Sequence, residues 1–124
     1  MWHYAPALPH WSLNDAASWF IEGLQEFVAV ERGPAEARGR YRQRYLPRLH
    51  EETVGRRFSS VEDAYADGYL ILLFLHDEFG TSPVHEVLNR SEPTFWRSVE
   101  RSLAVDREEL FQRWLAWKSG GPRM

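Results

Sequence analysis

The 124-residue sequence contains no cysteine, and its only lysine is Lys118. Without thiols there is neither a disulfide framework nor a thiolate metal site, so any metal must be held by histidine and carboxylate side chains. The longest apolar run, residues 69–75, is far too short to span a bilayer. The first eleven residues have no basic region and no long apolar core, so no secretion signal is visible. These absences favour a cytoplasmic protein without a membrane partner.

The net charge of −3 argues against a dedicated nucleic-acid-binding protein. One local exception is the basic segment 37–48, where arginines are interleaved with Tyr41 and Tyr45. Such a segment could stack on nucleic-acid bases, or it could form a solvated helix face. The segments on both sides are acidic and would weaken phosphate binding. We therefore favour the solvated face and expect no nucleic-acid partner.

The first predicted helix follows an irregular, proline-rich start of eleven residues. It begins at a cap supplied by Ser12 or Asn14, and it ends at Gly33-Pro34. Gly23 lies inside this helix, where it costs about 1 kcal/mol relative to alanine and therefore calls for a structural reason. Apolar spacings of four, three and four predict one buried stripe, made by Ala17, Ile21, Leu24 and Val28.

The rest of the chain also has helical periodicity. Residues 35–58 predict a polar helix broken near Pro47. Residues 60–80 predict a helix that Ser60 caps, and its nearly all-apolar middle indicates a position at the centre of the fold. Shorter helices start near Pro83 and Pro93, and Asp106 caps a last one. No segment has the two-residue alternation of a strand. The sequence thus predicts an all-α, single-domain helical bundle over residues 1–124. It comprises an irregular start (1–11), two main helices (12–80) and closing helices (81–118).

One segment of the first helix resembles a known zinc site. The segment "ASWFIEGLQEFVA" is similar to the W-L-x-E-G-x-A-x-Y segment of gluzincin zinc metallopeptidases (the aminopeptidase N-like branch), although Gln25 and Phe27 depart from it. The glutamate of that segment is the family's third zinc ligand, so the resemblance implies that Glu22 is a metal ligand. The alternative is a carboxylate that simply faces water.

The family's other two zinc ligands come from an H-E-x-x-H helix, which this sequence does not contain in full. Both His50 and His85 start an H-E pair, but neither has the second histidine four residues later. Eighteen residues separate His3 from Glu22, which is the spacing of the aminopeptidase N-like branch. The resemblance therefore implies that His3 is the second histidine, and that the missing His-Glu pair would precede Met1.

A second segment carries the same resemblance. Residues 65–74 match the Y-x-x-G-x-x-x-L segment of the family, in which the tyrosine donates a hydrogen bond to the tetrahedral intermediate. This match implies a catalytic role for Tyr65, with Gly68 allowing close helix approach. The alternative for Tyr65 is core packing with its hydroxyl at a rim. The C-terminal helices are similar to the helical module that closes many such domains, so the resemblance extends to about Trp117.

Two functional hypotheses follow. In the first, the chain is the C-terminal helical part of a gluzincin catalytic domain, which hydrolyses peptide substrates only when an upstream His-Glu completes its site. With His3 and Glu22 alone, zinc should bind weakly or not at all, because catalytic zinc sites use three protein ligands.

In the second hypothesis, the chain is a catalytically inactive helical module with a protein partner or self-association, and a face containing Trp2, Trp11 and Trp19 is exposed. We expect His10, His76 and His85 to be surface or satisfied core residues, and Glu26 to be an exposed carboxylate or a neighbour of the site.

Overall fold

The computed structural model describes residues 18–50, 65–89 and 94–120, and every regular element in these ranges is helical. The prediction of an all-α fold is confirmed. The predicted irregular start and the caps at Ser12, Asn14 and Ser60 lie outside the described residues. In chain order the elements are α1 (Ser18–Glu31), α2 (Ala35–Tyr45), the 3₁₀ helix η2 (Leu46–His50), α3 (Ala66–Phe79), α4 (Thr81–Asn89), α5 (Phe95–Leu103) and α6 (Arg107–Gly120).

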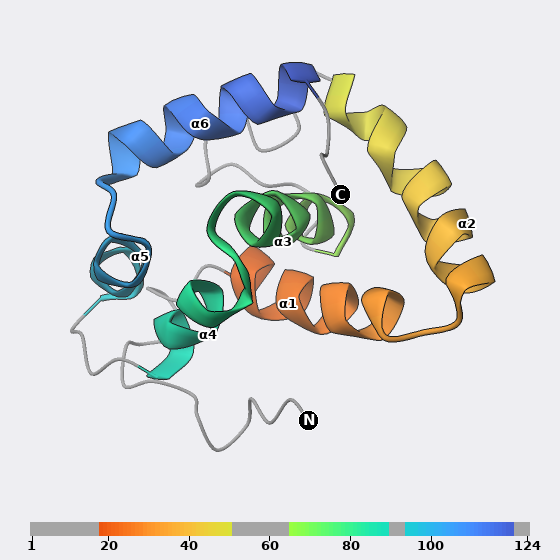
Figure 1. Cartoon of the computed structure of the whole chain (residues 1–124), viewed down its shortest axis with the longest axis horizontal. Helices are drawn as coiled ribbons and strands as arrows, with labels where there is room; N and C mark the ends of the chain where they lie inside the picture. Colours follow the sequence, from red (N-terminus) through yellow and green to blue (C-terminus); the bar gives the residue numbers. More distant parts are fainter. Residues whose placement is uncertain (1–17, 51–64, 90–93, 121–124) are drawn as a thin grey trace.

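Helix α3 lies at the centre, with the other helices arranged around it (Figure 1). All ten residues from 66 to 75 are buried, and those from 69 to 74 have no exposed surface. A helix that is apolar on every side needs partners all round, which explains this position. The central placement of this segment is therefore confirmed, and α3 is described from Ala66 onwards. No described helix is long and apolar enough to cross a membrane.

The buried face of α1 differs from the predicted stripe. Among the described members of that stripe only Leu24 is buried, while Ile21 and Val28 are partly exposed. The buried face instead comprises Trp19, Phe20, Gly23, Leu24, Phe27 and Val30. The prediction was wrong because it counted aliphatic residues, whereas three aromatic side chains and a glycine make up most of the buried face.

Trp19 is only 5% exposed, so its predicted place on an open face is also wrong. Its ring meets the edge of Phe20 at 5.9 Å and of Phe95 at 5.8 Å between centroids. Aromatic pairs prefer this edge-to-face arrangement, which joins α1 to α5. Trp2 and Trp11 lie outside the described residues.

Gly23 and Gly68 allow α1 and α3 to touch backbone to backbone. A Cβ placed on Gly23 would lie 2.5 Å from the carbonyl carbon of Gly68, and one on Gly68 would lie 2.5 Å from the carbonyl oxygen of Trp19. No side chain fits in that space, so both positions require glycine. This contact is the structural reason for a glycine inside α1, and it confirms the expected close helix approach at Gly68.

The helix ends follow local sequence signals. The hydroxyl of Thr94 accepts a hydrogen bond from the Arg97 amide at 3.2 Å, and the Asp106 carboxylate accepts one from the Glu109 amide at 2.8 Å. Gly80 ends α3 with a φ of 87°, a conformation that glycine adopts without strain. The predicted cap at Asp106 and the predicted end at Gly80 are confirmed.

Helix α6 covers the core at the C-terminal half of α3. The ring of Phe74 lies 5.4 Å from that of Trp114 and 5.6 Å from that of Trp117. The indole nitrogen of Trp117 donates a hydrogen bond to the Asp77 carboxylate at 2.7 Å. The large apolar surface of Trp117 is thus buried while its one polar atom is satisfied.

Candidate functional site

Two of the three predicted site residues lie within the described part of the chain. Glu22 is on α1 and is partly exposed, and Tyr65 directly precedes α3 with 52% of its surface exposed. This exposure excludes the alternative of core packing for Tyr65. His3 lies outside the described residues.

The glycine contact holds Glu22 and Tyr65 near the same helix crossing. A Cβ on Gly23 would lie 2.6 Å from the Cα of Gly68, so the two glycine Cα atoms are at most about 4 Å apart once a carbon–carbon bond of about 1.5 Å is added. Glu22 is one residue from Gly23, about 3.8 Å away, and Tyr65 is about one turn, or 5 Å, before Gly68. The Cα atoms of Glu22 and Tyr65 are therefore no more than about 13 Å apart.

The described residues do not by themselves fit a catalytic zinc ion. No group of three or more histidine, aspartate or glutamate side chains in residues 18–50, 65–89 and 94–120 is placed to hold a metal. Of the proposed ligands, only Glu22 belongs to these ranges, whereas catalytic zinc takes three protein ligands and water. A complete site would need donors from elsewhere.

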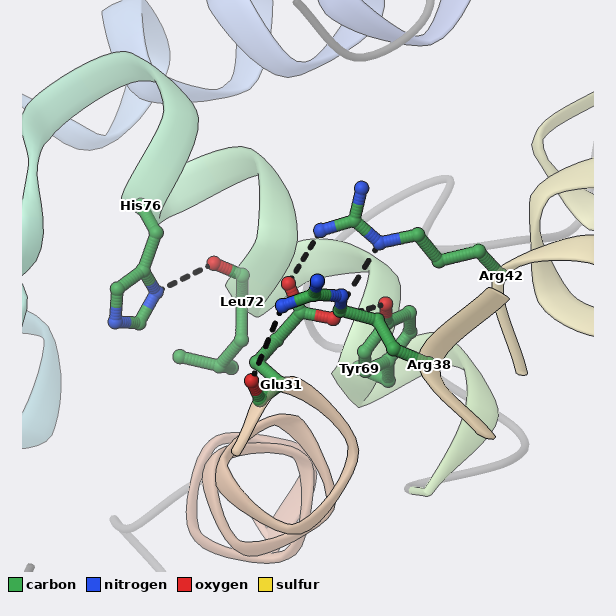
Figure 2. A network of polar contacts seen from close by, with 6 residues as sticks. All are labelled: Glu31, Arg38, Arg42, Tyr69, Leu72 and His76. Atoms are coloured by element: carbon green, nitrogen blue, oxygen red, sulfur yellow. Dashed lines mark hydrogen bonds and ion pairs between the residues drawn. The ribbon is translucent and has the colours of Figure 1, made fainter. Parts of the chain in front are cut away.

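A second polar cluster lies at the other end of α1, around Glu31 (Figure 2). Arg42 donates to the Glu31 carboxylate through both Nε and Nη2, and Tyr69 donates its hydroxyl proton at 3.2 Å. Arg38 reaches the Glu31 carbonyl oxygen at 3.5 Å. The cluster thus connects α2, α1 and α3 through one carboxylate, and sequence patterning did not identify it.

The role of this cluster is structural and not catalytic. Burial of the Tyr69 hydroxyl, reinforced by the charge of Glu31, raises the pKa of Tyr69 far above its usual value. The hydrogen bond to Glu31 raises the pKa of Arg42. Both donors therefore stay protonated near neutral pH, so neither Tyr69 nor Arg42 can act as a general base.

Arg48 and Asp67 form a second polar link to α3. Asp67 is 1% exposed, and its Oδ1 accepts hydrogen bonds from Arg48 Nε at 3.1 Å and Nη2 at 2.6 Å. A buried carboxylate needs such a partner. In the sequence, only the position of Asp67 beside a long apolar run indicated that this carboxylate could be buried. That position does not identify Arg48 as its partner.

His76 and His85 lie side by side on α3 and α4, with ring centroids 6.2 Å apart. The Nδ1 of His76 is 2.8 Å from the Leu72 carbonyl oxygen, which can only accept, so Nδ1 carries the proton. The His76 ring also stacks on Phe27 at 4.1 Å. Burial lowers the pKa of His76, and burial together with the neighbouring His76 lowers the pKa of His85 to about 4. Both rings are therefore neutral at pH 7.

Glu26 takes part in a weaker contact. The hydroxyl of Tyr45 lies 3.5 Å from Glu26 Oε1, which joins α1 to the last residue of α2. Glu26 is partly exposed. Its described contact is thus with the polar side of α2.

Comparison with known protein families, curated proteins and solved structures finds no match to this chain.

Proposed function

We propose that this chain carries the helical part of a gluzincin-like zinc peptidase site. In this proposal His3 and Glu22 are zinc ligands, and Tyr65 donates a hydrogen bond to the oxyanion of a peptide substrate. The observation that supports it is the contact between Gly23 and Gly68, because this contact joins the two segments that carry the resemblance. The exposure of Tyr65 also suits a phenol that must reach a substrate.

The proposal requires donors that the described residues do not supply. A first histidine and a general-base glutamate would come from a His-Glu pair directly before Met1, as the H-E-x-x-H pattern demands. Zinc bound there would polarise the scissile carbonyl and activate water. Without that pair, the chain should bind zinc weakly or not at all and should not hydrolyse peptides.

Zinc calorimetry tests the proposal directly. Zinc is titrated into the chain as given and into a version extended by His-Glu before Met1, each with and without the substitution Glu22→Gln. We expect the extension to tighten zinc binding at least about a hundredfold, and Glu22→Gln to remove most of that gain. An extension that leaves the affinity unchanged, or a gain that survives Glu22→Gln, would overturn the proposed site.

The second candidate is a catalytically inactive helical module that binds a protein partner or a second copy of itself. It is favoured by the lack of a three-ligand metal group among the described residues and by α2, which buries none of its residues. Size-exclusion chromatography with light scattering tests self-association. A clean monomer that takes up no zinc, even when extended, would count against both the peptidase and self-association.

A further inference from the structure

Helix α2 presents two different faces. Arg38, Arg42 and Tyr45 share one face and contact Glu31 and Glu26 of α1. Arg40 and Arg44 lie one turn apart on the opposite face, since two residues correspond to about 200° of rotation around a helix. Both are exposed. Tyr41 lies beside them on the helix surface with 37% of its surface exposed, and its ring contacts that of Tyr45 at 5.8 Å. Figure 1 shows α2 at the edge of the fold, and no other labelled helix lies on its outer side.

The outward arginines differ from the other basic groups around α2. Arg42 and Arg48 are paired with Glu31 and Asp67, whereas Arg40 and Arg44 form no ion pair with the residues that the structure describes. Together with Tyr41 they line an open hollow of about 200 Å³. Two guanidinium groups beside an exposed phenol ring offer hydrogen-bond donors for an anion and a surface for stacking.

From this arrangement we propose that Arg40, Tyr41 and Arg44 form a docking surface for an acidic peptide segment of a partner protein. We call these three residues the arginine face. Arginine binds carboxylates through two parallel hydrogen bonds. Positions i and i+4 of a helix are about 6 Å apart along its axis, which is close to the roughly 6.6 Å between alternate residues of an extended strand. An extended segment with glutamates at alternate positions therefore matches the two arginines.

The charges favour a peptide over a nucleic acid. The whole chain carries a net charge of −3, and the arginine face offers two cationic groups. Nucleic-acid binding usually depends on a larger number of phosphate contacts along a basic stripe, within a domain of positive overall charge. A short acidic peptide needs one or two good pairs, so the arginine face suits it better. This inference does not depend on the proposed zinc site.

Fluorescence anisotropy with defined probes tests the inference on the full chain. The probe is a fluorescein-labelled peptide of alternating glutamate and serine, compared with a lysine–serine peptide of equal length and with an oligothymidylate. We expect the acidic peptide to bind at low ionic strength and more weakly as salt is added, because the contacts are exposed. The lysine–serine peptide should not bind.

Charge-reversal variants locate the binding surface. Arg40→Glu and Arg44→Glu should each weaken binding of the acidic peptide several-fold, and the double variant should weaken it about tenfold or more. Arg97→Glu is the matched control, because it changes the net charge equally and lies on α5, across the fold from α2 (Figure 1). A glutamate at position 97 is also compatible with the Thr94 cap. Circular dichroism verifies that each variant keeps its helices.

Four results would overturn the inference. They are no binding of the acidic peptide at low salt, equal weakening by Arg97→Glu, unchanged affinity in the double variant, and tighter binding of the oligothymidylate than of the peptide. The last result would assign the arginine face to nucleic acid. A loss of affinity for the acidic peptide in the α2 variants alone would support the docking surface.

Discussion

Gly23 and Gly68 lie backbone against backbone where α1 crosses α3, at a distance that no side chain could share. The two residues belong to the two segments of the proposed gluzincin-like site, one directly after Glu22 and the other three residues after Tyr65. The crossing therefore brings α1 and α3 into contact and limits the separation of the two candidate site residues. Its integrity is the first condition for any function of this site.

Alanine at position 23 should destabilise the protein. Its Cβ would meet backbone atoms of Gly68 at 2.5–2.7 Å, and backbone cannot move aside as a flexible side chain can. We expect Gly23→Ala to lower the free energy of unfolding by about 3 kcal/mol, although alanine favours a helix. Urea denaturation followed by circular dichroism measures the change.

Gly39→Ala is the matched control, because a Cβ there has no atom within 4 Å and the residue also lies inside a helix. It should leave stability unchanged or raise it by up to about 1 kcal/mol. Equal effects at positions 23 and 39 would show that the helix crossing is looser than described.

The Glu31 carboxylate should hold α2 against the rest of the fold. Glu31→Gln removes the charge that Arg42 and Tyr69 share, and we expect a loss of about 1 kcal/mol, since Arg42 can return to water. A double-mutant cycle with Arg42→Gln should give a coupling energy of similar size.

The exposed pair Glu109–Arg113 on α6 provides the comparison. Glu109→Gln should change stability by no more than about 0.5 kcal/mol, as is usual for surface ion pairs. A vanishing coupling energy between Glu31 and Arg42 would mean that α2 is held by other contacts.

Arg48→Met should be more harmful than the loss of an ordinary surface arginine. Methionine keeps an apolar stem but removes both hydrogen bonds to the buried Asp67 carboxylate. We expect a loss of about 2–3 kcal/mol, against about 0.5 kcal/mol or less for the exposed Arg97→Met. Thermal and urea unfolding of the two variants measure the difference, and similar values for both would contradict the role of Arg48.

Stability should fall as the pH drops from about 6.5 towards 4 because of His76 and His85. The folded-state pKa of each lies below the unfolded value of about 6.5, so above that pH both states are neutral and there is no penalty. Below it the unfolded chain takes up protons that the folded rings resist, which favours unfolding. Each histidine contributes a slope of at most about 1.4 kcal/mol per pH unit.

Urea unfolding across this pH range, for the wild type and for His76→Phe/His85→Gln, isolates the effect. Titration of the carboxylates is common to both proteins and cancels in the difference. The variant should lose less stability on acidification than the wild type. Parallel curves would show that the two rings titrate normally in the folded protein.

Signals within a few residues of each other were reliable guides to the fold. The ends at Gly33-Pro34 and Gly80, and the cap at Asp106, depend on local backbone conformation and hydrogen bonding, and the structure has them where they were predicted. The unbroken apolar character of residues 69–75 likewise required a central position for α3. For the candidate site, the sequence supplied the residue types at Glu22 and Tyr65, and the helix crossing supplied the limit of about 13 Å between their Cα atoms.

The buried face of α1 and the hydrogen bonds between distant residues could be identified only from the tertiary structure. Glu31 and Tyr69 are 38 positions apart, and Trp117 and Asp77 are 40 apart, so no local pattern pairs them. The amino-acid sequence by itself determined that this protein is all-helical, with one helix too apolar to lie at the surface. Which faces meet was decided by the helix crossing at Gly23 and Gly68, because the fit of side chains across a contact depends on both partners at once.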